Sequence, residues 1–241
     1  MQTVSYLLPA HNEENTIPDT LRALVTRLAQ LPGSEAIVIE NGSSDQTAEV
    51  AKKLGEELKI PEVAIRVEVS RKGYGNALRK GIEVATSEYL MLTAADLPFG
   101  FSDLDAALAL DSLPAITIGS KAHRDSHVQV STVRRTMSAT FRILRRVLLG
   151  VDVGDSQGTI LIERKFAQSL LPELQSEGFF LSTELIALAS ARGASIGEIP
   201  VDYSNPRPDS TVKPVSDSID VLREMFALRR RIKQSAFQTR S

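Results

Sequence analysis

The sequence contains no cysteine among its 241 residues. Disulfide bridges, thiolate metal sites and a cysteine nucleophile are therefore excluded. The three histidines, His11, His123 and His127, are not spaced with carboxylates in the way that zinc ligands are, so we expect no zinc centre. A chain without thiols suits a reducing compartment, and we expect a cytoplasmic protein.

Long apolar runs are also missing. No segment approaches the roughly 20 apolar residues that cross a bilayer, and the first residues lack the basic region and the cleavage site of a signal peptide. We therefore expect any membrane contact to be peripheral, at the inner face. The formal net charge of −2 gives no general attraction to nucleic acid, so a nucleic-acid partner is not expected.

What is present is the composition of one globular domain, with 42% hydrophobic and 24% charged residues. In the first half, short apolar runs alternate with helical stretches. This alternation predicts an α/β fold with a Rossmann-like, mostly parallel central sheet flanked by helices. The predicted strands are Thr3–Leu8, Ala36–Glu40, Ala64–Val69, Tyr89–Thr93 and Ala115–Gly119. The predicted helices are Asn15–Gln30, Asp45–Leu58, Tyr74–Thr86 and Ser102–Leu110.

The second half is less regular. Its apolar periodicity predicts a long helix first, then strands and helices in turn, with a proline-rich loop before the last helix. These elements are the helix Ser131–Leu149, the strand Gly158–Glu163, the helix Ser182–Arg192, the strand Ser195–Val201 and the helix Val215–Lys233.

Polar or glycine-rich sequence follows each of four predicted strands. The loops read PAHNEEN after Leu8, ENGSSDQT after Ile39, SRKGYGN after Val69 and TAADLPFG after Leu92. Ligands of parallel sheets bind beyond the carboxyl ends of the strands. We therefore expect the four loops to gather at one edge of the sheet and to form one pocket for a diphosphate.

Two of these loops offer groups for a nucleotide. Glu40 and Asn41 present acceptors and donors for a nucleobase or a ribose, and Asp45 is expected to cap the following helix. Arg71 and Lys72 stand just before a glycine-rich helix start, where backbone N–H groups and the helix dipole favour an anion. The alternatives are a plain strand–turn–helix junction in the first case and a solvated basic turn in the second.

Asp96 follows a buried strand in the fourth loop. A carboxylate at such a position is a natural ligand for Mg²⁺ or Mn²⁺ that bridges a diphosphate. The alternative is a turn cap that leads into Pro98.

The loops also match known motifs in order along the chain. PAHNEENTI reads like P-A-x-N-E-E, ENGSSDQTAEVA like D-D-G-S-x-D-x-T, RKGYGNALRKG like G-x-G-x-A-x-x-x-G and TAADL like D-A-D-L. Further along, GDSQGTILIERK reads like D-x-x-x-G-x-x-L-F-R and RPDSTVK like R-x-G-x-S-K. The set resembles the inverting family 2 glycosyltransferases with the GT-A fold, and among them the polyprenyl-phosphate sugar transferases of the dolichyl-phosphate mannose synthase type. The likeness covers about residues 3–213.

This resemblance implies a transferase that binds a nucleotide-sugar donor and uses Mg²⁺ or Mn²⁺ held at Asp96. The catalytic residues that it implies are Asp96, Lys121 and Arg207. The substrate-binding residues that it implies are Pro9, Asn12, Glu13, Glu40, Asn41, Arg71, Gly73, Ala95, Arg134 and Lys213.

The chain departs from the family pattern at three places. Glu40 and Asn41 replace paired aspartates, Ala94 replaces the first aspartate of the metal motif, and Ser182 replaces an aspartate that is the usual general base. A phosphate monoester, with a second pKa near ~6, is an anion at neutral pH and attacks without a base, whereas a sugar hydroxyl needs one. The missing base therefore favours a phosphate acceptor, and it equally fits a loss of catalysis.

Two basic amphipathic helices point to a lipid surface. In the long helix of the second half, apolar residues such as Val147 recur at spacings of three and four, between flanks that include Arg145 and Arg146. Such a helix is typical of a lipid interface, and the alternative is a helix packed on the core with a basic outer face. Residues 215–241 are expected to form a second basic helix and a tail after a domain of residues 1–214.

The predicted function is the inverting transfer of a sugar from a nucleotide-sugar donor to a polyprenyl phosphate or another phosphate-bearing acceptor. Two alternatives stay open. One is the same enzyme class with a soluble acceptor, and the other is a degenerate relative that binds nucleotide without catalysis. The oligomeric state is open as well, a homo-oligomer included.

Overall fold

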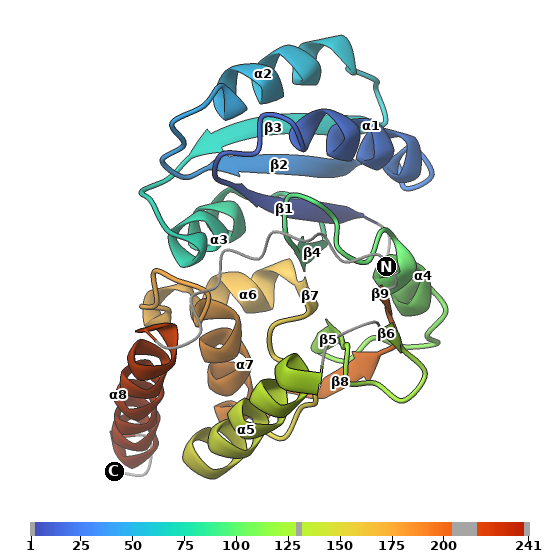
Figure 1. Cartoon of the computed structure of the whole chain (residues 1–241). Coiled ribbons are helices and arrows are strands. Elements are labelled where there is room, and N and C mark those ends of the chain that lie inside the picture. The colour runs from blue at the N-terminus through green and yellow to red at the C-terminus, as the bar shows by residue number, and fades with distance from the viewer. Residues whose placement is uncertain (1–2, 129–131, 204–215, 239–241) are drawn as a thin grey trace.

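The computed structural model describes residues 3–128, 132–203 and 216–238, and the side chains of these residues other than 132–137, 216–219 and 235–238. Seven strands form the central sheet in the order β3-β2-β1-β4-β7-β5-β8 (Figure 1). The first four strands run parallel, and β7 lies antiparallel between β4 and β5. The strands are β1 (Val4–Ala10), β2 (Ser34–Glu40), β3 (Val63–Val69), β4 (Tyr89–Leu92), β5 (Ile116–Gly119), β7 (Thr159–Glu163) and β8 (Ile196–Ile199).

Helices connect and cover these strands. A small two-stranded sheet of β6 (His127–Val128) and β9 (Asp202–Tyr203) lies apart from the main sheet. The helices are α1 (Ile17–Leu28), α2 (Thr47–Glu57), α3 (Tyr74–Val84), α4 (Ser102–Leu108), α5 (Thr132–Leu149), α6 (Arg164–Leu170), the 3-10 helix η1 (Leu171–Glu173), α7 (Leu181–Ala191) and α8 (Ser216–Gln238).

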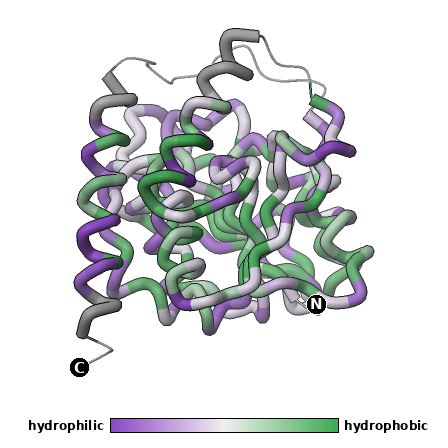
Figure 2. Tube along the Cα trace, turned by 90° about the horizontal axis from the view of Figure 1, so that it is seen from below, coloured by the Kyte–Doolittle hydropathy of each residue, from purple (hydrophilic) through white to green (hydrophobic). Residues whose placement is uncertain are grey.

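Successive residues of a strand point to opposite faces of the sheet, and β1 shows this directly. Leu7 packs in one core with Leu78 of α3 and Leu185 of α7. Leu8 packs in a second core with Leu21 of α1. The sheet is therefore covered on both faces, as its apolar strands predict. Figure 2 shows the hydrophobic stretches enclosed in the interior, and it shows α8 alternating between hydrophilic and hydrophobic positions.

The predicted elements of the first half are all present, with ends shifted by a few residues. The expected helix cap at Asp45 is displaced, because α2 begins at Thr47 after Gln46. The Asp45 carboxylate nevertheless accepts the Thr47 backbone N–H at 3.0 Å. The helix α6 and the strands β6 and β9 were not predicted, because stretches this short do not show a readable period.

Helix α5 corrects part of the sequence interpretation. Arg145, expected on an exposed basic flank, is only 1% exposed. Phe141 and Leu144 pack against the core, which is the alternative left open above. Ile143 and Val147 still face solvent, with exposed fractions of 63% and 68%. Among the described helices, none combines the length and apolar character that crossing a membrane requires.

A buried carboxylate stabilises the sheet at the amino-terminal end of its parallel strands. Glu35, at the start of β2, accepts hydrogen bonds from Ser5 Oγ at 2.6 Å and from the Thr86 backbone N–H at 2.6 Å, and it pairs with Arg66 at 3.3 Å. Burial opposes ionisation, but the hydrogen bonds from Ser5 and Thr86 and the charge of Arg66 outweigh it and lower the pKa of Glu35 below its ordinary 4.5.

We predict that Glu35→Gln lowers the free energy of unfolding by about 2 kcal/mol at neutral pH, because it removes charged hydrogen bonds. Since the pKa of Glu35 is lowered in the folded state, its contribution is complete above pH ~4.5 and disappears as the pH falls through the folded pKa. Denaturant unfolding of both proteins from pH 7 to pH 3 measures this. The gap between them should narrow with acid, and the exposed Glu62→Gln serves as the control with no such gap.

Candidate active site

The loop after β1 is joined to the loop after β2 by the side chain of Asn12. Asn12 adopts a left-handed backbone conformation with φ of 59°, which asparagine tolerates better than most residues. Its Oδ1 accepts the Ser44 backbone N–H at 2.8 Å, and its own N–H donates to Ser43 Oγ at 3.1 Å. Close by, the Glu13 N–H donates to Thr47 Oγ1 at 2.8 Å. The first two loops therefore form one unit.

Asn41 extends this unit to the loop after β3. Its side chain is buried, its Nδ2 donates to the Ala10 carbonyl at 2.9 Å, and its Oδ1 accepts the Gly73 N–H at 3.4 Å. The Glu40 carboxylate accepts the Ser43 N–H. Both residues were predicted to meet the nucleobase or ribose. The structure shows that the Asn41 amide also holds three loops together, and its role toward a ligand stays a prediction.

The turn before α3 is shaped by two glycines. Gly73 has a φ of 128°, a conformation that L side chains rarely adopt. The Gly75 N–H donates to the Glu177 carbonyl at 2.8 Å. A Cβ on Gly75 would lie 2.5 Å from the Ser176 carbonyl oxygen. The backbone of 176–178 therefore presses against the turn, and only glycine permits that approach.

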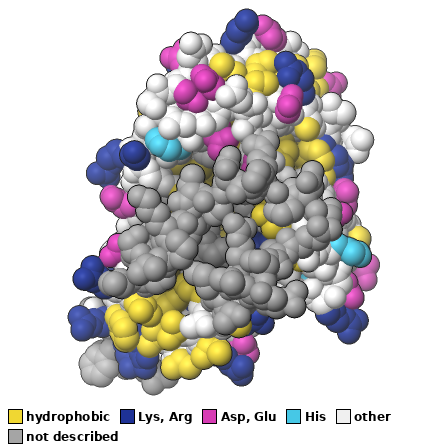
Figure 3. All heavy atoms as spheres, in the orientation of Figure 1, with side chains coloured by type: hydrophobic (Ala, Val, Ile, Leu, Met, Phe, Trp, Pro, Cys, Tyr) yellow, Lys and Arg dark blue, Asp and Glu magenta, His cyan; other side chains and the backbone are white. Residues whose placement is uncertain are grey.

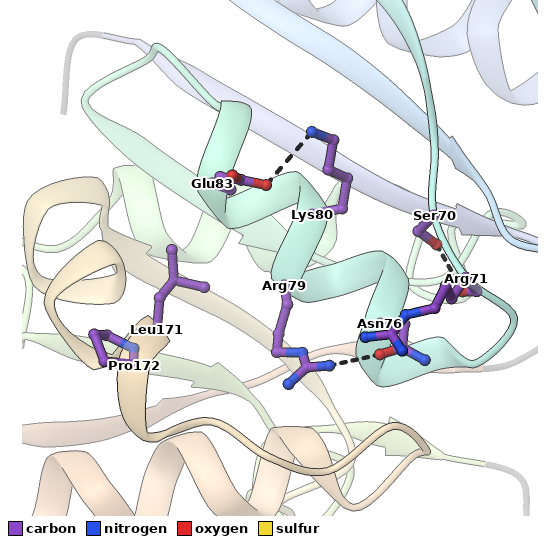
Figure 4. A pocket seen from close by; sticks show the side chains of 8 residues that line it. All are labelled: Ser70, Arg71, Asn76, Arg79, Lys80, Glu83, Leu171 and Pro172. Carbon is purple, nitrogen blue, oxygen red and sulfur yellow. Dashed lines mark hydrogen bonds and ion pairs between the residues drawn. The ribbon is translucent and has the colours of Figure 1, made fainter.

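Arg71 begins an open groove of about 470 Å³ along the outer side of α3 (Figure 4). In the close-up, Arg79 and Asn76 point toward one another, and Lys80 reaches Glu83. Arg79 donates to Asn76 Oδ1 at 2.6 Å and to the Leu174 carbonyl at 2.9 Å. Two of the three cations of this groove are thus engaged within the protein, while Arg71 is exposed and has no ion pair among the described residues.

Asp96 lies just beyond β4, the strand that pairs with β1. Its neighbour Ala95 is buried, and the Ala95 carbonyl accepts Thr20 Oγ1 of α1 at 2.6 Å. Leu97 has a φ of 47°, so the chain turns sharply after Asp96. Asp96 is partly buried, and no hydrogen bond or ion pair to its carboxylate is found within the described residues. None of the described side chains therefore competes with a ligand for this carboxylate.

The described residues contain no group of three carboxylates or histidines that could hold a metal ion. Ala94 stands where a second carboxylate would strengthen such a site. Asp96 thus fits a divalent ion only as one ligand among several, with the phosphate oxygens of a nucleotide as the others.

Tyr74, the first residue of α3, connects the glycine turn to α7. Its hydroxyl has the Ser182 side chain as a hydrogen-bond partner. Burial raises the pKa of Tyr74 to about 12, the Ser182 hydrogen bond lowers it, and the negative charge of Asp96 adds to the rise. Tyr74 and Ser182 therefore form a polar pair at the position of the missing base, and the charge of the Asp96 carboxylate acts on it.

Lys121 follows β5, in the less regular second half of the chain. Its Nζ pairs with Asp155 at 2.9 Å and lies 5.3 Å from the ring centre of Phe99 and 5.9 Å from that of Tyr203. The structure thus shows a partner that sequence reasoning did not single out. The signal was available, because Asp155 is the aspartate of the GDSQG motif.

Arg145 of α5 holds the loop that carries Asp155. It donates through Nη1 to Ser156 Oγ at 2.8 Å and also to the Val153 carbonyl. Ser156 in turn lies 2.9 Å from Thr183 Oγ1 of α7. Burial lowers the pKa of Arg145, and the carboxylates of Asp155 and Glu198 oppose that shift. Sequence reasoning missed this role, because nothing local distinguishes Arg145 from its arginine neighbours.

Glu184 of α7 holds the segment that touches the glycine turn. Its buried carboxylate accepts the N–H groups of Gln175 and Ser176 at 3.0 and 2.9 Å and pairs with Arg231 of α8. Ser176 Oγ donates to Glu224 of α8 at 2.7 Å. The last helix therefore stabilises the segment that contacts the glycine turn.

Of the remaining predicted residues, the structure describes the side chain of one and not those of the other three. Pro9 is buried within β1, in register with Ile39. Arg207 and Lys213 lie outside the described residues, as does the side chain of Arg134. The structure thus brings the predicted residues of the first half to one edge of the sheet, and the roles of all of them remain predictions.

With this geometry in place, the class of protein follows. The model of the glycosyl transferase family 2 matches residues 5–170. The structure of glucosyl-3-phosphoglycerate synthase from Mycobacterium tuberculosis in complex with UDP superposes with a TM-score of 0.66 at 19% identity, over 96% of this chain and 80% of that one. The same synthase with Mn²⁺, UDP and phosphoglyceric acid gives a TM-score of 0.67 at 20% identity, over 94% and 77%. The fold is GT-A.

Relatives of known activity agree with this class. Glycosyltransferase AglD of Haloferax volcanii is 31% identical over 89% of this chain, which spans only 35% of that protein. The human dolichyl-phosphate β-glucosyltransferase is 30% identical over 83% of this chain and 67% of its own length. The yeast enzyme of the same name is 26% identical over 94% and 74%. The chain belongs to glycosyl transferase family 2 and is a glycosyltransferase.

The close approach at Gly75 can be tested. We predict that Gly75→Ala costs about 1–3 kcal/mol of stability, because its Cβ would meet backbone carbonyls that cannot rotate away, and that it weakens nucleotide binding at the displaced turn. Thermal unfolding and calorimetry measure the two effects. Gly178→Ala is the matched control, since a Cβ there meets nothing within 4 Å. Equal behaviour of the two variants would contradict the importance of this contact.

Proposed function

We propose that the protein transfers a sugar from a nucleoside diphosphate to a polyprenyl phosphate, with inversion at the anomeric carbon. One observation supports this most strongly: four loops meet at one edge of the sheet, and the carboxylate of Asp96 on the fourth loop has no hydrogen bond or ion pair among the described residues. Two of the relatives carry the name dolichyl-phosphate β-glucosyltransferase, which favours a lipid phosphate acceptor.

The donor diphosphate would lie over the glycine turn, between Arg71 and Asp96. Helix N–H groups and Arg71 stabilise its negative charge. A bound Mg²⁺ or Mn²⁺, with Asp96 as its protein ligand, would supply charge neutralisation for the leaving nucleoside diphosphate. Solved neighbours contain Mn²⁺ or Mg²⁺ together with UDP. Lys121 and Arg207 are the further cations that we assign to the leaving group.

The acceptor needs little activation in this scheme. Ser182 and Tyr74 form a neutral pair, since the pKa of Tyr74 is about 12, and neither removes a proton at neutral pH. An acceptor phosphate already carries the charge that it needs to attack. Arg134 and Lys213 are the residues that we propose to orient it.

We propose that the acceptor lies at the inner face of the membrane, and an apolar surface supports contact with a membrane. Ile143 and Val147 of α5 and Phe226 of α8 are exposed, and α5 contacts α8. In Figure 3, apolar side chains gather between these two helices, with basic side chains at their margin. Such a surface fits the interface of an anionic bilayer. We propose that α8, within residues 215–241, contributes to it.

Asp96→Asn is predicted to reduce turnover at least about 100-fold, because the metal ion that neutralises the charge of the leaving group then loses its anionic protein ligand. Release of nucleoside diphosphate from a panel of nucleotide sugars, with polyprenyl phosphate and either Mg²⁺ or Mn²⁺, measures the effect. The exposed Asp111→Asn should behave like the unaltered protein. Unchanged turnover in Asp96→Asn would overturn the assignment of this carboxylate.

Replacing Ile143 and Val147 together by glutamate is predicted to weaken binding to vesicles of phosphatidylglycerol and phosphatidylcholine about tenfold, since both apolar contacts are lost. Vesicle cosedimentation measures the bound fraction. Val69→Glu is the control, because Val69 is also exposed but lies at the end of β3. Equal loss in both proteins would contradict a specific α5 surface.

Two other functions make different predictions. A soluble phosphate acceptor is suggested by the phosphoglyceric acid in a solved neighbour, and it predicts turnover with soluble phosphate monoesters but not with lipid phosphate. A degenerate nucleotide-binding protein is suggested by Ala94, and it predicts nucleotide binding without product for every acceptor. The same turnover assay separates the three.

A further inference from the structure

Phe179 is an aromatic residue that the core does not use. Its side chain is 56% exposed, while the next residue, Phe180, is buried at 3%. Phe180 therefore anchors the segment that leads into α7. Exposure of a large aromatic ring sacrifices apolar burial, so the position of Phe179 calls for another explanation.

The ring of Phe179 is held in place by stacking. It lies on the ring of Tyr74 with centroids 4.8 Å apart and an interplanar angle of 28°, a geometry that stabilises aromatic pairs. Tyr74 stands between Gly73 and Gly75, within the turn assigned to the diphosphate. One face of the Phe179 ring is covered by Tyr74, so its exposed area comes from the opposite face and the edges.

The backbone on either side keeps this pair rigid. The Gly75 N–H donates to the Glu177 carbonyl at 2.8 Å, and the Glu184 carboxylate fixes the N–H groups of Gln175 and Ser176. The aromatic surface is therefore set in position before any ligand binds, which reduces the entropy lost on binding.

Polar groups border the aromatic pair. The Tyr74 hydroxyl is paired with the Ser182 side chain, and the carboxylate of Asp96 is close enough to influence its ionisation. An open aromatic face beside fixed polar groups matches a sugar ring, which has an apolar face of C–H bonds and a polar rim of hydroxyls.

We propose that Phe179, stacked on Tyr74, is the platform on which the sugar ring of the donor lies during transfer. This inference rests on the proposed function and adds the residue that recognises the sugar. The nucleobase is assigned to Glu40 and Asn41, on the β2 loop, whereas Phe179 stacks on the turn assigned to the diphosphate. In a nucleotide sugar the sugar is bonded to the diphosphate on the side away from the nucleoside, so we place the platform at the sugar end of the donor.

The platform predicts that Phe179 contributes to binding of the sugar and not of the nucleotide. In Phe179→Ala, the affinity for the nucleotide sugar should fall about tenfold, while the affinity for the matching nucleoside diphosphate stays unchanged. Calorimetry with UDP and UDP-glucose, and in parallel with GDP and GDP-mannose, gives this ratio for each pair that the unaltered protein binds. An unchanged nucleoside diphosphate affinity also shows that the variant is folded.

Phe179→Trp provides a second, independent readout. The chain has no tryptophan, so this substitution places the single tryptophan of the variant on the platform, where it can be excited selectively, while retaining an aromatic face. It should restore the nucleotide-sugar affinity, and its fluorescence should change more with the nucleotide sugar than with the nucleoside diphosphate. A melting temperature close to that of the unaltered protein is expected for both variants, because the side chain is largely exposed.

Each outcome decides the question. Equal loss of affinity for nucleotide sugar and nucleoside diphosphate in Phe179→Ala would overturn the platform and place the ring at the nucleotide. An increase in the acceptor KM with unchanged donor affinity would overturn it in favour of an acceptor contact. Unchanged affinity and turnover would overturn the platform alone and leave the transferase assignment intact. If the unaltered protein bound no nucleotide sugar, the proposed function would fail, and the platform with it.

Discussion

The site depends on the close backbone contact between the glycine turn of α3 and the segment 176–178. This contact joins the first half of the chain, which carries the four loops, with the second half, which carries Phe179 and α7. It exists because neither glycine of the turn has a side chain: a Cβ on Gly75 would collide with the Ser176 carbonyl oxygen, and a Cβ on Gly73 with the Glu177 carbonyl oxygen. A charged pair stabilises this contact: the Glu184 carboxylate accepts a hydrogen bond from the backbone of the segment, and Arg231 of α8 pairs with Glu184. Loss of the glycine contact or of the Glu184–Arg231 pair would leave the position of Phe179 relative to the turn less well fixed.

The first half of the fold could be predicted closely from the sequence. Each loop follows an apolar strand, and parallel strands bring their carboxyl ends to one edge, so Asn12, Glu40 and Asp96 were expected near one another. This inference needs only local pattern and sheet geometry. The antiparallel position of β7 between β4 and β5 could not be read in this way, because strand order is decided by contacts between distant segments.

The side-chain partners were harder to predict than the elements. Arg145 reads as one of several arginines in an amphipathic helix, yet it is buried against the loop that carries Asp155. Asn41 reads as a ligand-binding amide, yet both of its polar atoms bond to the protein. In each case the burial of a polar group is made favourable by partners far away in sequence, and no local period reveals them.

The buried guanidinium of Arg145 connects the surface of α5 to the loop that carries Asp155. Ile143 and Val147 of α5 are exposed to solvent, whereas Arg145 of the same helix is buried. Arg145 donates hydrogen bonds to Val153 and Ser156, at the two ends of that loop. That loop orients Asp155, which in turn holds the ammonium group of Lys121. The exposed surface of α5 and the cation at the end of β5 are thus linked by one continuous series of contacts, so a substitution that displaces α5 is expected to displace Lys121 as well.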